Sequence, residues 1–174
     1  MDALAALLGR RSCRKYTEQE ISEQDVDTML RAAMAAPSAR NQQSWRFVVV
    51  RDRDKLARLS QATPHAGMLK TAALGLVVAG ETRDTVCPGY WVQDCSAATQ
   101  NLLLAAHAIG LGAVWIGVHP IPERKEAVRT LVGLPTGIEA FALIAVGYPN
   151  EAKPPSERFE PRFVHAESWQ DDRV

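Results

Sequence analysis

The spacing of apolar residues predicts an amphipathic helix in the first quarter of the chain. Its apolar positions recur every three or four residues, as on one face of a helix: Val26, Met29, Leu30 and Ala33. Ser22, followed three residues later by Asp25, resembles a capping box and predicts where this helix begins. Pro37 predicts its end near Ala35, because the residue before a proline avoids helical geometry.

The same reasoning predicts four further helices and four strands. The helices are expected at residues 2–9, 56–60, 91–111 and 122–131, and the strands at residues 45–50, 74–80, 113–118 and 139–147. The continuous apolar character of 74–80 indicates burial on both faces of that strand. Because unequal helical insertions separate the strands, the pattern favours an α+β fold over a regularly alternating one.

The end of the chain differs in composition from the rest. After Pro149 the sequence is rich in Pro, Glu, Lys and Arg, which predicts an extended C-terminal arm over residues 150–174. The aromatic residues near its end, within 163–169, require a surface to cover. At this length the chain is expected to form a single domain over residues 1–174, with the arm attached to it.

Charge and hydropathy exclude two classes of partner. Twenty Lys and Arg balance twenty Asp and Glu, so the sequence shows no general electrostatic footprint for nucleic acid or an anionic membrane. The longest apolar runs are far shorter than a spanning helix requires, and residues 1–9 lack the layout of a signal peptide. We therefore expect a cytoplasmic protein with no nucleic-acid or membrane partner.

The cysteines argue against a disulfide framework and a zinc site. Cys13, Cys87 and Cys95 are odd in number and lack CxxC spacing. They are expected to be reduced thiols, and no metal is expected.

Two short clusters carry candidate chemistry. Arg10, Arg11 and Arg14 surround Ser12, and guanidinium groups beside a hydroxyl suit a phosphate monoester. Between a predicted helix and a strand lies a polar loop that includes Pro37, Ser38, Ala39 and Asn41, whose groups can hydrogen-bond a polar heterocycle. Taken singly, the first cluster fits a solvated basic turn and the second a turn that caps its own backbone.

Longer stretches of sequence contain these clusters and favour a binding role over a simple surface turn. In chain order they are RRSCRKYTEQEIS, AAPSARNQQSWRFVVV, QDCSAATQNLLLAAHAIGLGAVWIGVHP, LVGLPTGIEAFALIAVGYP and ERFEPRFVHAESW. Together they cover most of the chain, and they resemble the nitroreductase family of FMN-dependent oxidoreductases. The resemblance implies a central, mostly antiparallel sheet flanked by helices, with the C-terminal arm exchanged in a homodimer.

The resemblance also assigns cofactor-binding residues. It implies that the FMN phosphate and ribityl chain contact Arg10, Ser12 and Arg14, together with Arg11. It implies that the flavin of the partner subunit is reached by a loop containing Pro37, Ser38, Ala39 and Asn41, with Ala39 contributing its backbone.

Two further contacts follow from the resemblance, and each has an alternative. Trp115, Ile116 and Gly117 resemble a strand end beside the flavin ring, where a backbone N–H can meet N5, although Trp115 equally suits a core position. Arg158 matches a basic residue that completes the phosphate site, with an exposed charge on the arm as the rival interpretation. Many relatives carry a cation where this chain has Gly67, which puts substrate range in doubt unless Lys70 or a helix N-terminus replaces it.

The expected activity is that of an NAD(P)H-dependent flavin oxidoreductase. The resemblance implies that NAD(P)H and a nitroaromatic, quinone or similar acceptor use one pocket in turn, in a ping-pong mechanism with no catalytic side chain. Two alternatives stay open. One is a different reaction on the same fold, such as flavin fragmentation, dehalogenation or azoline oxidation, and the other is a flavin-binding protein without turnover.

Overall fold

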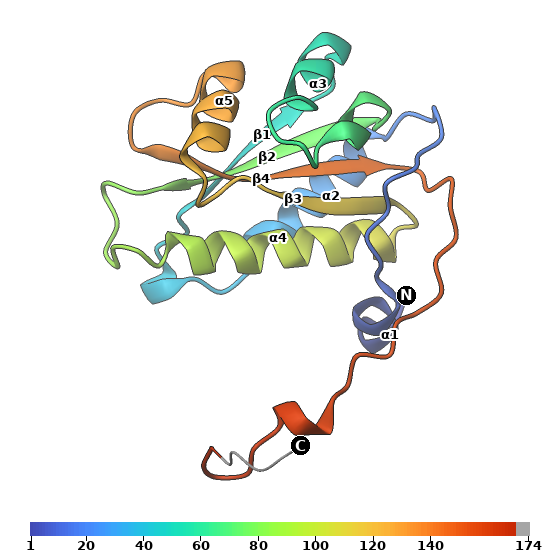
Figure 1. Cartoon of the computed structure of the whole chain (residues 1–174), viewed down its shortest axis with the longest axis vertical. Helices are drawn as coiled ribbons and strands as arrows, with labels where there is room; N and C mark the ends of the chain where they lie inside the picture. The colour runs from blue at the N-terminus through green and yellow to red at the C-terminus, as the bar shows by residue number, and fades with distance from the viewer. Residues whose placement is uncertain (170–174) are drawn as a thin grey trace.

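A computed structural model describes residues 1–169 of the chain, so residues 170–174 of the predicted arm lie outside the described part. A four-stranded sheet lies between two layers of helices, which confirms the expected α+β class (Figure 1). The strands are β1 (Trp45–Val50), β2 (Leu74–Glu81), β3 (Gly112–Gly117) and β4 (Ile138–Gly147). The helices are α1 (Ala3–Gly9), α2 (Glu23–Met34), α3 (Arg53–Leu59), α4 (Trp91–Ala108) and α5 (Pro122–Val132), with 3₁₀ turns η1 (Ala39–Asn41), η2 (Gly67–Lys70) and η3 (Pro161–Phe163).

The sheet has the strand order β1-β2-β4-β3, and each neighbouring pair is antiparallel. The two central strands are buried on both faces, as the apolar run 74–80 predicts. Alternation along β2 sends Leu76 and Val78 toward the core under α2 and α4, and Val77 and Ala79 toward the core under α3 and α5. The two outer helical layers thus cover opposite faces of one sheet (Figure 1).

Local capping explains where the first helices begin. Asp2 accepts the backbone N–H groups of Leu4 and Ala5 at 3.1 and 3.2 Å, which satisfies two donors at the start of α1. The capping box before α2 is confirmed, because Ser22 Oγ accepts the Asp25 N–H at 3.1 Å and donates to the Asp25 carboxylate at 2.8 Å. Both helices therefore begin at the residues that the sequence indicates.

The central helix is shorter than predicted. It ends at Ala108, because Gly110 adopts a left-handed conformation with φ +86° that terminates the helix. Leu111 lies in the connection, and Gly112 is the first residue of β3. The turn η2, which the sequence pattern does not signal, forms the approach to β2.

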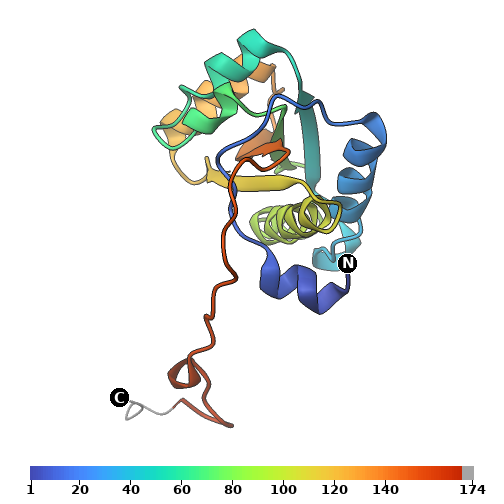
Figure 2. The ribbon, with the colours of Figure 1, turned by 90° about the vertical axis from the view of Figure 1, so that its right-hand side faces the viewer.

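The residues after Pro149 leave the body of the protein as an extended arm (Figures 1 and 2). Only the short turn η3 interrupts it within the described residues. Phe159 and Phe163 on the arm are more than two-thirds exposed. The start of the arm runs beside the N-terminal segment, since Tyr16 forms a bridge with Pro149 and the Arg14 N–H donates to Glu151.

Candidate cofactor site

The segment from Arg10 to Arg14 lies beside the open edge of the sheet. β3 is an edge strand, and Ser12 forms an isolated parallel bridge with Ala113 on the side away from β4. The Cys13 N–H donates to the Ala113 carbonyl at 3.0 Å. The predicted phosphate-binding segment is therefore placed by backbone pairing, with Cys13 buried in the core and Arg14 exposed.

The beginning of the arm fixes this segment from the other side. Glu151 accepts the backbone N–H of Arg14 at 2.8 Å, and Lys153 Nζ binds both Glu151 at 2.9 Å and the Ser12 carbonyl at 2.8 Å. The Arg11 guanidinium donates to the Pro154 carbonyl at 2.7 Å. The Arg14 N–H bond and Lys153 lower the pKa of Glu151 to about 2, so its carboxylate is ionised at neutral pH.

The guanidinium groups of Arg10, Arg11 and Arg158 gather here. Partial burial lowers the pKa of Arg10, and the positive charges of Arg158 and Arg11 lower it further. Within residues 1–169 no ion pair joins any of the three to a carboxylate. The Nε of Arg10 is buried without a hydrogen-bond partner among the same residues. An orphaned donor amid clustered positive charge fits a phosphate group.

A cavity of about 540 Å³ lies along β3, and Arg14 is the residue of the first motif that lines it. Its lining combines one arginine, the turn before β2 and the end of the edge strand: Arg14, Pro64, His65, Gly67, Met68, Val114, Trp115, Ile116 and Gly117. The structure thus joins the first motif to the predicted strand end. It also places Gly67 and His65 at the same opening.

The ladder determines which backbone groups of β3 face this cavity. The Val118 N–H donates to the Phe141 carbonyl of β4 at 3.3 Å. Because backbone groups in an antiparallel strand point alternately to one neighbour and to the other side, the N–H and C=O groups of Trp115 and Gly117 point away from β4, to the open edge. The Gly117 carbonyl accepts Arg124 at 3.2 Å. The N–H groups of Trp115 and Gly117 therefore point to the side where an acceptor heterocycle would lie, and a Cβ at Gly117 would meet no atom within 4 Å.

Trp115 satisfies both interpretations of its position. Its backbone lines the cavity, whereas its indole packs against Phe141 with a centroid distance of 5.4 Å and joins the core beneath α4. The side chain is thus part of the core, and only the backbone is placed to contact a cofactor.

The second polar loop lies elsewhere. Ala39 is hydrogen-bonded to Asp94 in the first turn of α4, whereas Gly9 lies against His107 in its last turn. The 18 residues of α4 make it about 27 Å long. Figure 1 shows η1 and α1 at opposite ends of this helix. Within one chain, Pro37, Ser38, Ala39 and Asn41 therefore do not meet the arginine cluster.

Residues that sequence reasoning missed connect segments distant in the chain. Glu151 and Lys153 order the first motif, and Asp94 orders the loop around Ala39. No local pattern marks them, because each partner lies dozens of residues away. Lys70, the candidate for the cation missing at Gly67, lines a different groove together with Arg51, Arg53 and neighbouring residues.

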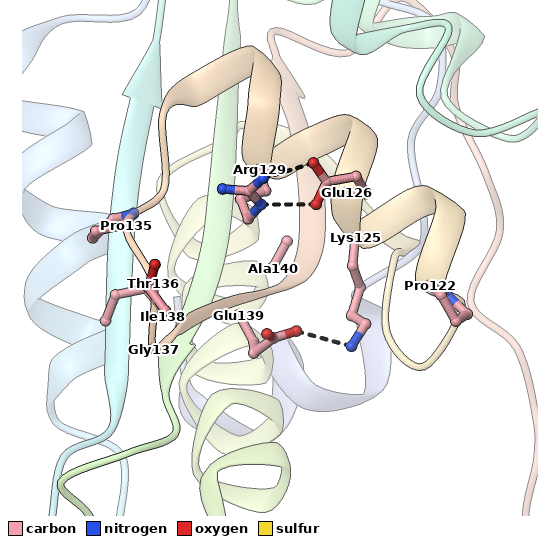
Figure 3. Close-up of a pocket in the computed structure, with 10 residues that line it drawn as sticks. All are labelled: Pro122, Lys125, Glu126, Arg129, Pro135, Thr136, Gly137, Ile138, Glu139 and Ala140. Carbon is pink, nitrogen blue, oxygen red and sulfur yellow. Dashed lines mark hydrogen bonds and ion pairs between the residues drawn. The ribbon is translucent and has the colours of Figure 1, made fainter.

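Another cavity, of about 490 Å³, lies between α5 and the start of β4 (Figure 3). Its two cations are both neutralised, since Lys125 pairs with Glu139 at 2.8 Å and Arg129 with Glu126 at 2.7 Å. It therefore lacks the uncompensated charge of the edge site. Among the described residues, no group of three or more His, Cys, Asp or Glu side chains is arranged to hold a metal ion. No helix of residues 1–169 has the length and apolar character to cross a membrane.

Comparisons with known proteins identify relatives with the same fold. The model of the Nitroreductase family matches residues 7–82 and 62–148. A Methanothermobacter thermautotrophicus protein assigned as an NADH dehydrogenase/NAD(P)H nitroreductase is 43% identical over 169 residues, which span 97% of this chain and 88% of its own. The FMN-dependent nitroreductase of Clostridium difficile R20291 superposes with TM-score 0.90 at 30% identity, covering 95% of this chain and 99% of that one. A Desulfovibrio desulfuricans protein assigned as a nitroreductase and solved with FMN gives TM-score 0.82 at 31% identity, over 98% and 99% of the two chains.

Proposed function

The chain belongs to the nitroreductase family, and we propose that it is an NAD(P)H-dependent FMN oxidoreductase that reduces nitroaromatic, quinone or similar small acceptors. The observation that carries this proposal is the uncompensated cluster of Arg10, Arg11 and Arg158 beside the open edge of β3. A phosphate at the cluster and a flat heterocycle in the cavity along β3 would both be held beside this edge strand.

Each part of the site has a distinct role in this proposal. The guanidinium groups and hydroxyl that bind the phosphate and ribityl chain are those of Arg10, Arg11, Ser12, Arg14 and Arg158. The backbone of Trp115, Ile116 and Gly117 orients the ring through its outward N–H groups. Bound FMN would supply the redox chemistry, as the carrier of electrons between NAD(P)H and the acceptor.

A second copy of the chain completes the site in this proposal. The loop carrying Pro37, Ser38, Ala39 and Asn41 lies at the far end of α4 from the arginines, so a homodimer is needed to bring the two clusters together. The exposed apolar side chains of Leu4 and Leu8 on α1, and of Phe159 and Phe163 on the arm, support such an interface. We propose that the arm is exchanged between the two subunits.

The cytoplasm is the proposed location. The thiols of Cys13, Cys87 and Cys95 are all free, which suits a reducing compartment.

The absorption spectrum of the purified protein, followed by release and mass measurement of the chromophore, tests the cofactor. Anaerobic addition of NADH or NADPH should bleach the bound FMN, and menadione or a nitrofuran should restore its colour. Initial rates at varied concentrations of both substrates should give the parallel double-reciprocal lines of a ping-pong reaction. FMN that is bound but never bleached would exclude the reductase and favour a flavin-binding protein.

Sedimentation of the holoprotein tests the assembly. We expect a dimer at all concentrations that retain FMN. A monomer that keeps stoichiometric FMN would contradict a site shared between two subunits.

A further inference from the structure

We propose that Asp94 is a positioning residue: it sets the conformation of the loop from Pro37 to Ser44 and thereby completes the FMN site of the second subunit. This inference rests on the proposed function, because it assigns the loop to a flavin held by the other copy of the chain.

The carboxylate of Asp94 accepts hydrogen bonds from three residues of the loop. It is 2% exposed and lies in the first turn of α4. Its Oδ1 accepts the Ala39 N–H at 2.9 Å, and its Oδ2 accepts Gln42 Nε2 at 2.8 Å and Ser44 Oγ at 3.0 Å. All three donors come from the loop, and within residues 1–169 no cation pairs with this carboxylate. A buried charge satisfied in this way constrains its donors tightly.

The loop needs such an anchor, because its backbone is strained. Arg40, Asn41 and Gln43 adopt left-handed conformations with φ of 47°, 55° and 50°. Residues with a side chain disfavour this region, and such geometry persists where the surroundings impose it, commonly at functional sites. Three such residues within a span of four indicate a loop held in one shape by its contacts.

The predicted flavin-binding side chains have hydrogen bonds of their own within the loop. Ser38 Oγ accepts the Gln43 N–H at 3.0 Å, and Gln43 Nε2 donates to Asn41 Oδ1 at 3.0 Å. Gln43 lies in the chain between Gln42 and Ser44, the two residues whose side chains Asp94 binds, so Asp94 positions these bonds through the backbone. Gln42 Oε1 also accepts the Cys87 N–H at 2.9 Å, which ties the loop to the approach to α4.

Gln42 donates to Asp94, so a substitution at either position disrupts this bond and the two substitutions together should restore it with the direction of donation reversed. Asp94→Asn keeps one acceptor for Ala39 but turns its second group into a donor that faces the Gln42 amide donor. Gln42→Glu places a second carboxylate beside Asp94. In the double variant, the new amide at position 94 donates to the new carboxylate at position 42, which still accepts the Cys87 N–H. The charge thus moves from position 94 to position 42 and the bond between the two side chains is restored, while the Cys87 carbonyl loses the bond that Gln42 Nε2 donates to it at 3.4 Å.

Titration of FMN into each dimeric apoprotein tests this coupling. We expect each single variant to weaken FMN binding by about ten-fold or more, as a mismatched buried hydrogen bond does, and the double variant to recover most of the affinity. Affinity in the double variant no better than in the worse single variant would overturn the proposal.

Mixed dimers test whether Asp94 acts on the other subunit's site. One subunit carries Asp94→Asn and the other Arg10→Ala, and two affinity tags allow the mixed dimer to be purified. Each parent homodimer should lose FMN, whereas the mixed dimer should retain one FMN, because its one intact site combines the arginine cluster of the first subunit with the loop of the second.

The control is the wild-type dimer in the same titration. If wild type binds FMN and the mixed dimer binds none, Asp94 does not act across the interface. In that case this inference fails and the proposed function stands. If wild type itself binds no FMN, the proposed function fails and this inference with it.

Discussion

The carboxylate of Glu151 accepts the backbone N–H of Arg14 at 2.8 Å, and this bond joins the arm to the segment that carries the phosphate-binding arginines. Lys153 strengthens the junction, since it contacts both Glu151 and the Ser12 carbonyl. The order of the proposed phosphate site therefore depends on one ionised carboxylate.

Glu151→Gln should change how stability depends on pH. The Arg14 N–H bond and Lys153 lower the pKa of Glu151 from 4.5 to about 2 in the folded protein. Between these values the unfolded chain binds more protons than the folded one, so the stabilising effect is complete above pH 4.5 and is lost as pH falls toward 2. In urea unfolding, the advantage of wild type over Glu151→Gln should shrink across this window.

The exposed Glu123→Gln in α5 is the matched control for that experiment. A purely steric defect would give a difference in unfolding free energy between wild type and Glu151→Gln that stays constant from neutral pH to pH 3. That result would contradict the role of the charge.

Arg10→Ala should weaken FMN binding without lowering the thermal stability of the apoprotein. Loss of a charge-assisted hydrogen bond costs about 1.5–3 kcal/mol, which is about a 10- to 150-fold rise in the dissociation constant. The repulsion from Arg158 and Arg11 disappears in the variant, so the thermal midpoint of the apoprotein should stay level or rise. Saturating FMN should restore much of the activity.

Arg31→Ala provides the comparison for Arg10, because Arg31 is an exposed arginine paired with Asp27 on α2. If saturating FMN restored no activity in a folded Arg10→Ala protein, the residue would act in more than cofactor retention.

Gly117→Ala should separate folding from cofactor binding. A Cβ at Gly117 meets no atom within 4 Å, so the fold should accept it. A methyl group at the open edge should cost FMN about 1–3 kcal/mol of binding free energy through crowding. Thermal unfolding of the apoprotein and FMN titration measure the two effects independently.

Gly147→Ala should lower the thermal stability of the apoprotein, which Gly117→Ala should leave unchanged. Its Cβ would lie 2.8 Å from the Tyr16 ring, so the apoprotein itself should be destabilised. Equal loss of apoprotein stability in the two variants would contradict the placement of Gly117 at an open edge.

Gly67→Arg should raise the reduction potential of the bound flavin. Position 67 lines the cavity and has open space around it, so a cation there can reach the ring. Positive charge favours the anionic reduced form, and each 1.4 kcal/mol of preference corresponds to about 30 mV for two electrons. Reductive titration against a reference dye measures the shift, and Lys70→Arg in the neighbouring groove should leave it unchanged.

The positions of helices and strands could be predicted because their signals are local. Ser22 and Asp25 cap α2 through atoms three residues apart, and Pro122 with Gly133 delimits α5 within one short stretch. The central helix ended earlier than predicted because Gly110 adopts a left-handed conformation, which the spacing of apolar residues does not indicate. The arginine motif was equally visible, although its meaning depended on a family resemblance.

What the sequence by itself determined is the set of elements and the groups available for binding FMN, because periodicity, capping and residue chemistry act over a few positions. Only the tertiary structure decided which groups meet. Pairing of Ser12 with Ala113 and of Glu151 with Arg14 brings together segments about a hundred residues or more apart, and alternation in β3 sends the Trp115 indole to the core and its N–H to the cavity. The length of α4 separates the two binding clusters, because a rigid helix fixes the distance between its ends.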